Sequence, residues 1–211
     1  MRLMIAVPCL DQSRSEFTES VVNLVTKLAR DGVDFVYRQV KGTLTYQARE
    51  ELARAAIEGG FDYMLWLDSD MEIPANAYNL LMDGMMKTNA AFVTGIYRCR
   101  RKPFQKLVYR LISPFQAQYC GESLPGELFP VEGCGLGCVL VSVQALKTVW
   151  KRFGTAFTPT EGLGEDLAFC LRLKQCGFKA YAEPNVKCSH IGSISISCDD
   201  VDRLMDYFKR R

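Results

Sequence analysis

Short apolar runs alternate with longer amphipathic segments through the first hundred residues, and this alternation constrains the fold more than any other feature of the sequence. The apolar runs have the length of buried strands and cover residues 3–9, 33–40, 63–67 and 90–96. The segments between them predict helices, the first opened by a capping box of Ser13 and Glu16 and the others over residues 46–58 and 75–87. Such alternation is typical of βαβ units, so we expect an α/β fold with a mostly parallel central sheet flanked by helices.

The second half of the chain is less regular, because prolines between residues 103 and 130 interrupt its short strand-like runs. We expect strands over residues 138–143 and 181–187, a helix over residues 165–176 and a terminal helix over residues 199–209. The sequence has no internal repeat and no linker rich in Gly, Ser or Pro. A length of 211 residues fits one or two domains, and the unbroken pattern predicts a single domain over residues 1–211.

The composition excludes several classes of protein. Hydrophobic residues make up 48% and charged residues 24% of the chain, which are ordinary globular values and argue against disorder. The formal net charge of +2 indicates neither a nucleic acid nor a membrane surface as partner. We expect no targeting or transmembrane segment, because no apolar run approaches the required length. The 9 scattered cysteines form no CxxC pair, which predicts free thiols and a cytoplasmic location.

The apolar run over residues 63–67 is followed directly by two carboxylates, Asp68 and Asp70, with Ser69 between them. Ligands of parallel sheets bind beyond the carboxyl ends of the strands. Two carboxylates this close repel each other unless a cation lies beside them, and hard oxygen ligands suit Mg²⁺ or Mn²⁺. The pattern therefore predicts a metal site, although a polar turn with an aspartate capping the next helix would have the same sequence.

The chain has a single histidine, His190, which follows the strand predicted over residues 181–187. A lone histidine is usually structural, but imidazole is a common metal ligand and would complete a site that two aspartates leave short of ligands. A zinc site of Cys188, His190 and Cys198 is the rival interpretation. Its spacing matches no familiar zinc pattern, so we prefer the carboxylate site.

Glu165 and Asp166 open the helix predicted over residues 165–176, directly after Gly164. Acidic residues at a helix N-terminus are favourable for electrostatic reasons alone. The same helix dipole keeps a carboxylate ionised, which suits a general base or a group that stabilises developing positive charge. Both interpretations stay open.

Two further segments carry weaker signals. The glycines between Gly133 and Gly137 precede a strand and match no phosphate-binding loop, so a bulge or a close backbone approach is the expected use. Arg and Lys residues are dense between Arg98 and Arg110. We expect this basic segment to be a solvated loop or, alternatively, a loop that faces an anion.

Taken together, the order of these segments resembles the GT-A fold of nucleotide-sugar glycosyltransferases, particularly the family-2-like enzymes. The resemblance rests on residues 6–9, 46–49, 67–70, 164–170 and 189–192. It covers nearly the whole chain and extends to glycosyltransferase domains of large algal viruses. It implies a nucleotide-binding half over about residues 1–100 and an acceptor and sugar half over about residues 101–211. It leaves room for further C-terminal domains in a parent protein, and for a viral protein the cytoplasm would be that of the host.

The resemblance also implies a role for each site residue. Asp70 and His190 would ligate the metal, and Asp68 would reach it directly or through water. Asp166 and Glu165 would be the catalytic residues that face the transferred sugar or the acceptor hydroxyl. The nucleotide sugar would contact Pro8, Cys9, Leu10, Arg49, Asp68, Ser69 and Asp70.

The implied activity is transfer of a hexose or deoxyhexose from a UDP-sugar to a hydroxyl of a glycan or glycoprotein acceptor. A divalent ion stabilises the charge of the diphosphate leaving group, and an imidazole ligand favours Mn²⁺ over Mg²⁺. In an inverting enzyme Asp166 would deprotonate the acceptor. In a retaining enzyme the leaving phosphate could do so, with Asp166 or Glu165 stabilising the cationic sugar.

Two other classes of protein fit parts of the pattern. A haloacid-dehalogenase-like phosphohydrolase also places Asp-x-Asp at a strand end, but on the first strand and with Thr or Val two residues later, where this chain has Glu72. A non-catalytic nucleotide-sugar-binding domain of a larger protein would bind UDP without turning over any donor.

Overall fold

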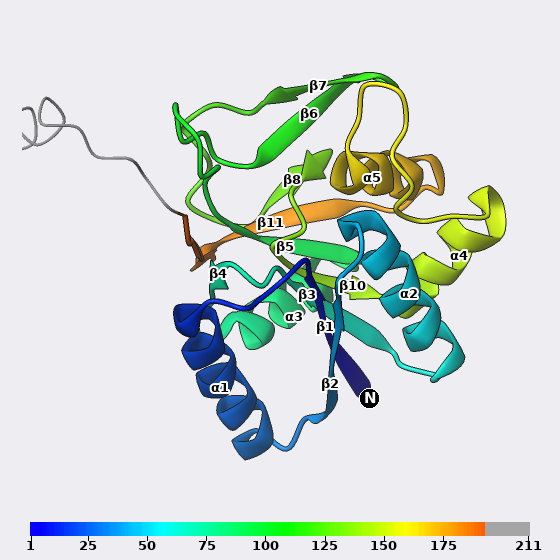
Figure 1. Cartoon of the computed structure of the whole chain (residues 1–211). Coiled ribbons are helices and arrows are strands. Elements are labelled where there is room, and N and C mark those ends of the chain that lie inside the picture. The colour runs from blue at the N-terminus through cyan, green and yellow to red at the C-terminus, as the bar shows by residue number, and fades with distance from the viewer. Residues whose placement is uncertain (193–211) are drawn as a thin grey trace, which may run out of the picture.

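A computed structural model describes residues 1–192, and its centre is a 7-stranded sheet in the order β2-β1-β3-β10-β5-β11-β8 (Figure 1). Strands β1, β2, β3, β5 and β11 run in one direction, whereas β10 and β8 run against their neighbours. The mostly parallel sheet is therefore confirmed. The strand bounds are β1 Arg2–Cys9, β2 Asp34–Lys41, β3 Tyr63–Leu67, β5 Phe92–Ile96, β8 Phe129–Val131, β10 Cys138–Ser142 and β11 Ala180–Lys187.

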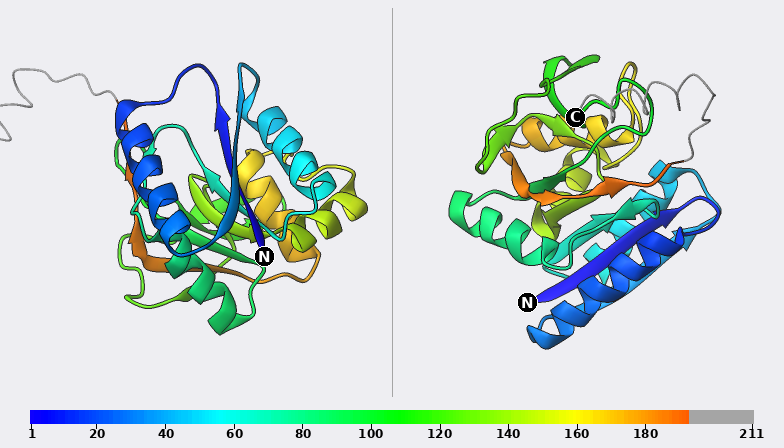
Figure 2. Two further views of the ribbon diagram at one scale, coloured as in Figure 1. Left: turned by 90° about the horizontal axis from the view of Figure 1, so that it is seen from below. Right: turned by 90° about the vertical axis from the view of Figure 1, so that its left-hand side faces the viewer.

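Helices cover both faces of this sheet, as Figure 2 shows. Alternate residues of β1 point to opposite faces, so Met4 packs in one hydrophobic cluster and Ile5 in the other. The first cluster lies under α2, α4 and α5, and the second lies under α1 and α3. The helix bounds are α1 Ser15–Arg30, α2 Thr45–Glu58, α3 Ala77–Thr88, α4 Val143–Phe153 and α5 Glu165–Gln175.

Two small antiparallel sheets complete the fold. One consists of β4 (Met71–Glu72) and β12 (Ser189–His190), and it pairs His190 with Met71. The other has the order β7-β6-β9, with β6 Val108–Ser113, β7 Gln116–Tyr119 and β9 Gly133–Cys134. Because β4 begins directly after Asp70, the first small sheet brings His190 to the carboxyl end of β3.

The structure differs from the sequence-based expectation at two helices. Helix α4 was not predicted, although Ser142 caps it by accepting a hydrogen bond from the Ala145 N–H (3.2 Å). The capping box at the start of α1 does not form, because α1 begins at Ser15. The Ser13 hydroxyl instead accepts from the Gln39 side-chain amide (3.2 Å).

The terminal helix expected over residues 199–209 lies outside the described residues, as does Cys198. None of the helices within residues 1–192 combines the length and apolar character needed to cross a membrane.

A buried network holds the segment that leads into α5. One carboxylate oxygen of Glu50, on α2, accepts hydrogen bonds from the Thr155 hydroxyl and from the backbone N–H groups of Ala156 (2.9 Å) and Phe157 (2.6 Å). From the other side, the Arg172 guanidinium donates to the carbonyls of Ala156 (2.8 Å) and Thr158 (2.7 Å). The segment is therefore clamped between α2 and α5, which fixes where the N-terminus of α5 lies.

This clamp predicts a large loss of stability on its removal. Glu50→Ala should lower the free energy of unfolding by about 2–3 kcal/mol, because buried backbone N–H groups lose their acceptor. Urea denaturation measures this change. Glu51→Ala is the matched control, since Glu51 is exposed and its pair with Arg38 is long (3.8 Å), and it should change the stability by less than about 0.5 kcal/mol. Equal effects of the two substitutions would contradict the clamp.

Candidate functional site

A cleft of about 530 Å³ opens at the carboxyl ends of β1 and β3 and brings together every residue predicted for the site except Cys9. Cys9 is buried in the sheet and does not line the cleft. The predicted residues in the lining are Pro8, Leu10, Arg49, Asp68, Ser69, Asp70, Glu165, Asp166 and His190. The cleft is also lined by Tyr97 and Arg100, which the sequence did not single out for it.

The inner wall of the cleft is organised by the buried side chain of Arg49. Its Nη2 lies 2.7 Å from the Asp68 carboxylate and its Nε lies 4.0 Å from the Glu165 carboxylate, while the guanidinium rests over the Trp66 ring. Burial opposes the charge of Arg49, but these carboxylates outweigh it and raise the pKa of the guanidinium. Arg49 Nε and Nη1 are buried without a hydrogen-bond partner among the described residues, so donors remain for a ligand.

Asp70 has different partners from Asp68. Its carboxylate lies 2.5 Å from Arg100 Nη1 and 3.6 Å from His190 Nε2. Burial raises the pKa of Asp70, but the neighbouring His190 and the charge of Arg100 lower it by more, and the net shift is downward. Asp70 is therefore held ionised.

The orientation of the His190 imidazole is set by its contacts with neighbouring segments. Its Nδ1 lies 2.8 Å from the Arg98 carbonyl, so a proton on Nδ1 is donated there and Nε2 is left to face Asp70. The Tyr97 ring packs edge-on against the imidazole, with 5.5 Å between the centroids. The Ile191 N–H donates to the Asp70 carbonyl (2.8 Å) and ties the two segments together. These contacts resemble the outer hydrogen bonds that orient a metal-ligating histidine.

The residues present fit a metal ion at Asp70 and His190. Two ligand atoms about 2.1 Å from one ion are roughly 3.0–3.4 Å apart, close to the separation of the Asp70 carboxylate and His190 Nε2. Within residues 1–192 no group of three His, Cys, Asp or Glu side chains converges, and Asp68 is engaged by Arg49. Ions such as Mg²⁺ commonly take one or two carboxylates and complete their shell with water and substrate phosphates.

Asp166 lies in the first turn of α5, where its carboxylate accepts a hydrogen bond from the Leu167 N–H (2.7 Å). The helix dipole led us to expect a carboxylate held firmly ionised. Instead, burial and then the charge of Glu165 raise the pKa of Asp166 to about 6. At neutral pH such a group is still mostly ionised, but it can take up a proton readily, as a general base must.

The glycine segment before β10 makes room for Tyr97. The Gly137 N–H donates to the Tyr97 hydroxyl (2.8 Å), and a Cβ at Gly135 would lie 2.1 Å from that oxygen. The Asp68 N–H donates to the Gly137 carbonyl (3.1 Å). The glycines therefore allow the close backbone approach that was expected of them, and the contact partner is a tyrosine of the cleft.

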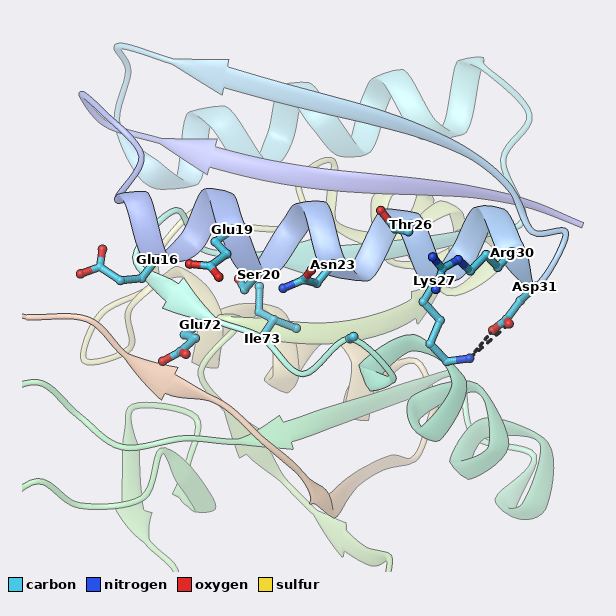
Figure 3. Close-up of a pocket in the computed structure, with 11 residues that line it drawn as sticks. Glu16, Glu19, Ser20, Asn23, Thr26, Lys27, Arg30, Asp31, Glu72 and Ile73 are labelled. Atoms are coloured by element: carbon cyan, nitrogen blue, oxygen red, sulfur yellow. Dashed lines mark hydrogen bonds and ion pairs between the residues drawn. The ribbon is translucent and has the colours of Figure 1, made fainter.

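A second cavity, of about 590 Å³, lies along α1 and is lined by polar side chains (Figure 3). Lys27 and Asp31 form an ion pair (2.9 Å) at one end, and Glu16, Glu19 and Glu72 line the other end. None of the residues predicted for the site lies here. The cleft beyond β1 and β3 is therefore the candidate functional site.

Neither a protein-family model nor a curated protein matches the sequence. Solved structures do match the fold. Protein A197 from STIV superposes with a TM-score of 0.63 over 92% of this chain and 87% of its own, at 20% identity. The structure of GalNAc-T7 with UDP, GalNAc and Mn²⁺ superposes with a TM-score of 0.57 over 92% of this chain and 44% of its own, at 12% identity. The GT-A fold is thereby confirmed, and the resemblance to algal viral domains stays a prediction.

The raised pKa of Asp166 predicts a stability that depends on pH. Its pKa of about 6 lies above the ordinary 3.8, so ionisation lowers the free energy of unfolding as the pH rises from about 4 to 7. Asp166→Asn removes this cost and should stabilise the protein by about 1–2 kcal/mol at pH 7.5, with a much smaller gain at pH 4. Urea denaturation at both pH values measures the difference. A gain that does not change with pH would contradict the raised pKa.

Proposed function

We propose that this chain is a metal-dependent glycosyltransferase that moves a hexose or deoxyhexose from a UDP-sugar to a hydroxyl of a glycan or glycoprotein acceptor. The observation that carries the proposal is the convergence of Asp70 and His190 with Glu165 and Asp166 on one cleft, at the strand ends of a GT-A fold. The GalNAc-T7 structure, which has this fold and contains UDP and Mn²⁺, supports the choice of donor and ion.

The nucleotide would lie against the end of β1 and the inner wall. Pro8 and Leu10 would pack on the uracil and ribose together with the backbone of Cys9, and Asp68 and Ser69 would lie on the ribose side. The unpartnered Nε and Nη1 of Arg49 would donate to the nucleotide. This arrangement uses the donors that the protein itself leaves unsatisfied.

Asp70 and His190 would hold Mn²⁺, with Mg²⁺ as the alternative, next to the donor diphosphate. When bound, the ion supplies positive charge that stabilises the leaving group. His190 Nε2 can ligate because the Arg98 carbonyl accepts the proton on Nδ1. Asp68, held by Arg49, would reach the ion only through water.

Asp166 would act on the acceptor side. In an inverting reaction its carboxylate takes the proton from the acceptor hydroxyl as that oxygen attacks the sugar. In a retaining reaction the leaving phosphate takes the proton, and Asp166 or Glu165 stabilises the cationic sugar. Both routes need a carboxylate at the start of α5, and the inverting route assigns that role to Asp166.

A donor screen tests the proposed activity. UDP release should occur with one or more UDP-sugars in the presence of Mn²⁺ and stop with EDTA. His190→Ala should weaken Mn²⁺-dependent UDP binding by about tenfold or more in calorimetry, with the fold retained by circular dichroism. Ser189→Ala is the matched control on the same strand and should bind like the parent.

Three outcomes of these experiments would each contradict a part of the proposal. UDP binding without turnover of any donor would leave a non-catalytic nucleotide-sugar-binding domain. Better competition by GDP than by UDP would overturn the choice of base. Binding that does not change in His190→Ala would remove the metal site.

Asp166→Asn tests the mechanistic role. Turnover should fall by about 10²-fold or more while UDP affinity changes little, because the substitution removes only the charge. The parent should lose activity as the pH falls below about 6, since protonation of Asp166 removes the base. Glu165→Gln is the control that separates the two neighbours. Activity of Asp166→Asn within a few-fold of the parent would return Asp166 to a structural role, because the amide oxygen of Asn can accept the same hydrogen bond from the Leu167 N–H.

A further inference from the structure

Arg100 pairs with the Asp70 oxygen that His190 does not approach, next to the place where a cation between Asp70 and His190 would lie. Its Nη1 lies 2.5 Å from Asp70 Oδ2, while His190 approaches the other oxygen, Oδ1. The Arg100 side chain is 50% exposed, unlike the buried Arg49 that holds Asp68. The protein therefore neutralises one aspartate with a fixed arginine and the other with an arginine at the cleft mouth.

The loop that carries Arg100 is closed at its base. The Leu107 N–H donates to the Tyr97 carbonyl (3.0 Å), and the Cys99 N–H donates to the Gln105 carbonyl (2.8 Å). The stem of Arg100 packs on Gly192, where an added Cβ would lie 3.3 Å from Arg100 Cδ. The backbone is thus anchored, and the guanidinium can leave Asp70 by side-chain rotation alone.

The cleft has an excess of acidic side chains, so the position of Arg100 decides which of them is neutralised. Carboxylates outnumber guanidinium groups in the lining, which includes Asp11, Asp68, Asp70, Glu165, Asp166, Arg14, Arg49 and Arg100. Arg49 is already committed to Asp68. A divalent ion at Asp70 would repel Arg100 at close range, and the nearest new anion would be the donor diphosphate, which a guanidinium can bind through two parallel hydrogen bonds.

We propose that Arg100 alternates between Asp70 in the free protein and the diphosphate in the donor complex. It opposes metal binding when no nucleotide is present and strengthens nucleotide binding once the metal is in place. Metal and nucleotide are therefore positively coupled through Arg100, and by linkage each raises the affinity for the other. This inference rests on the proposed function and adds a positioning residue to it.

Calorimetry of Arg100→Gln tests the coupling without any measurement of turnover. Mn²⁺ alone should bind about 3–10-fold more tightly than to the parent, because a competing charge is gone. At saturating Mn²⁺, UDP should bind about tenfold more weakly, because a charged donor to the diphosphate is lost. Arg101→Gln removes a neighbouring charge that does not line the cleft and should match the parent in both titrations.

The outcomes separate this inference from the proposed function. If the parent binds Mn²⁺ and UDP but Arg100→Gln matches it in either titration, the coupling is overturned and the glycosyltransferase proposal stands. If Arg101→Gln shows the same changes as Arg100→Gln, the effect belongs to the general charge of the loop, and the inference fails. If the parent does not bind Mn²⁺, the metal dependence of the proposed function fails and the inference fails with it.

Discussion

The burial of one guanidinium determines how the cleft is assembled. Arg49 is 2% exposed, and a buried charge is tolerated only where opposite charges lie beside it. It obtains them from Asp68 at the end of β3 and from Glu165 at the start of α5. One ion-pair network thereby joins α2, β3 and α5, so the wall that would bind a nucleotide and the turn that carries Asp166 are set by the same interaction.

The opposite wall is built by backbone pairing. Asp68 and Asp70 stand two residues apart, yet they face different partners because the chain turns between them, with the Met71 N–H donating to the Asp68 carbonyl (3.1 Å). That turn sends Met71 into β4, whose pairing with β12 delivers His190. Asp68 and Asp70 form one motif in the sequence but therefore belong to two different walls of the cleft.

The sequence predicts those parts of the fold and site whose signals are local. The apolar run over residues 63–67 and the acidic residues after it locate the end of β3, and the segment after Gly164 locates the start of α5. Contacts between distant segments have no such local signal in the sequence. The basic segment around Arg100 suggested a loop that faces an anion but not that the anion is Asp70, and nothing near Tyr97 indicates that Gly135 and Gly137 are small to accommodate it. Helix α4 was missed although Ser142 and the apolar spacing after it are helix signals.

The environments of the acidic side chains divide their chemistry. Asp70 faces an arginine and a histidine, which hold its pKa below the ordinary value and suit a permanent anion that binds a cation. Asp166 is half-buried next to Glu165, and its pKa rises to about 6. Titratable groups whose pKa values are pushed apart in one site mark different roles. The same type of side chain is therefore kept ionised at one end of the cleft and has a pKa near neutrality at the other.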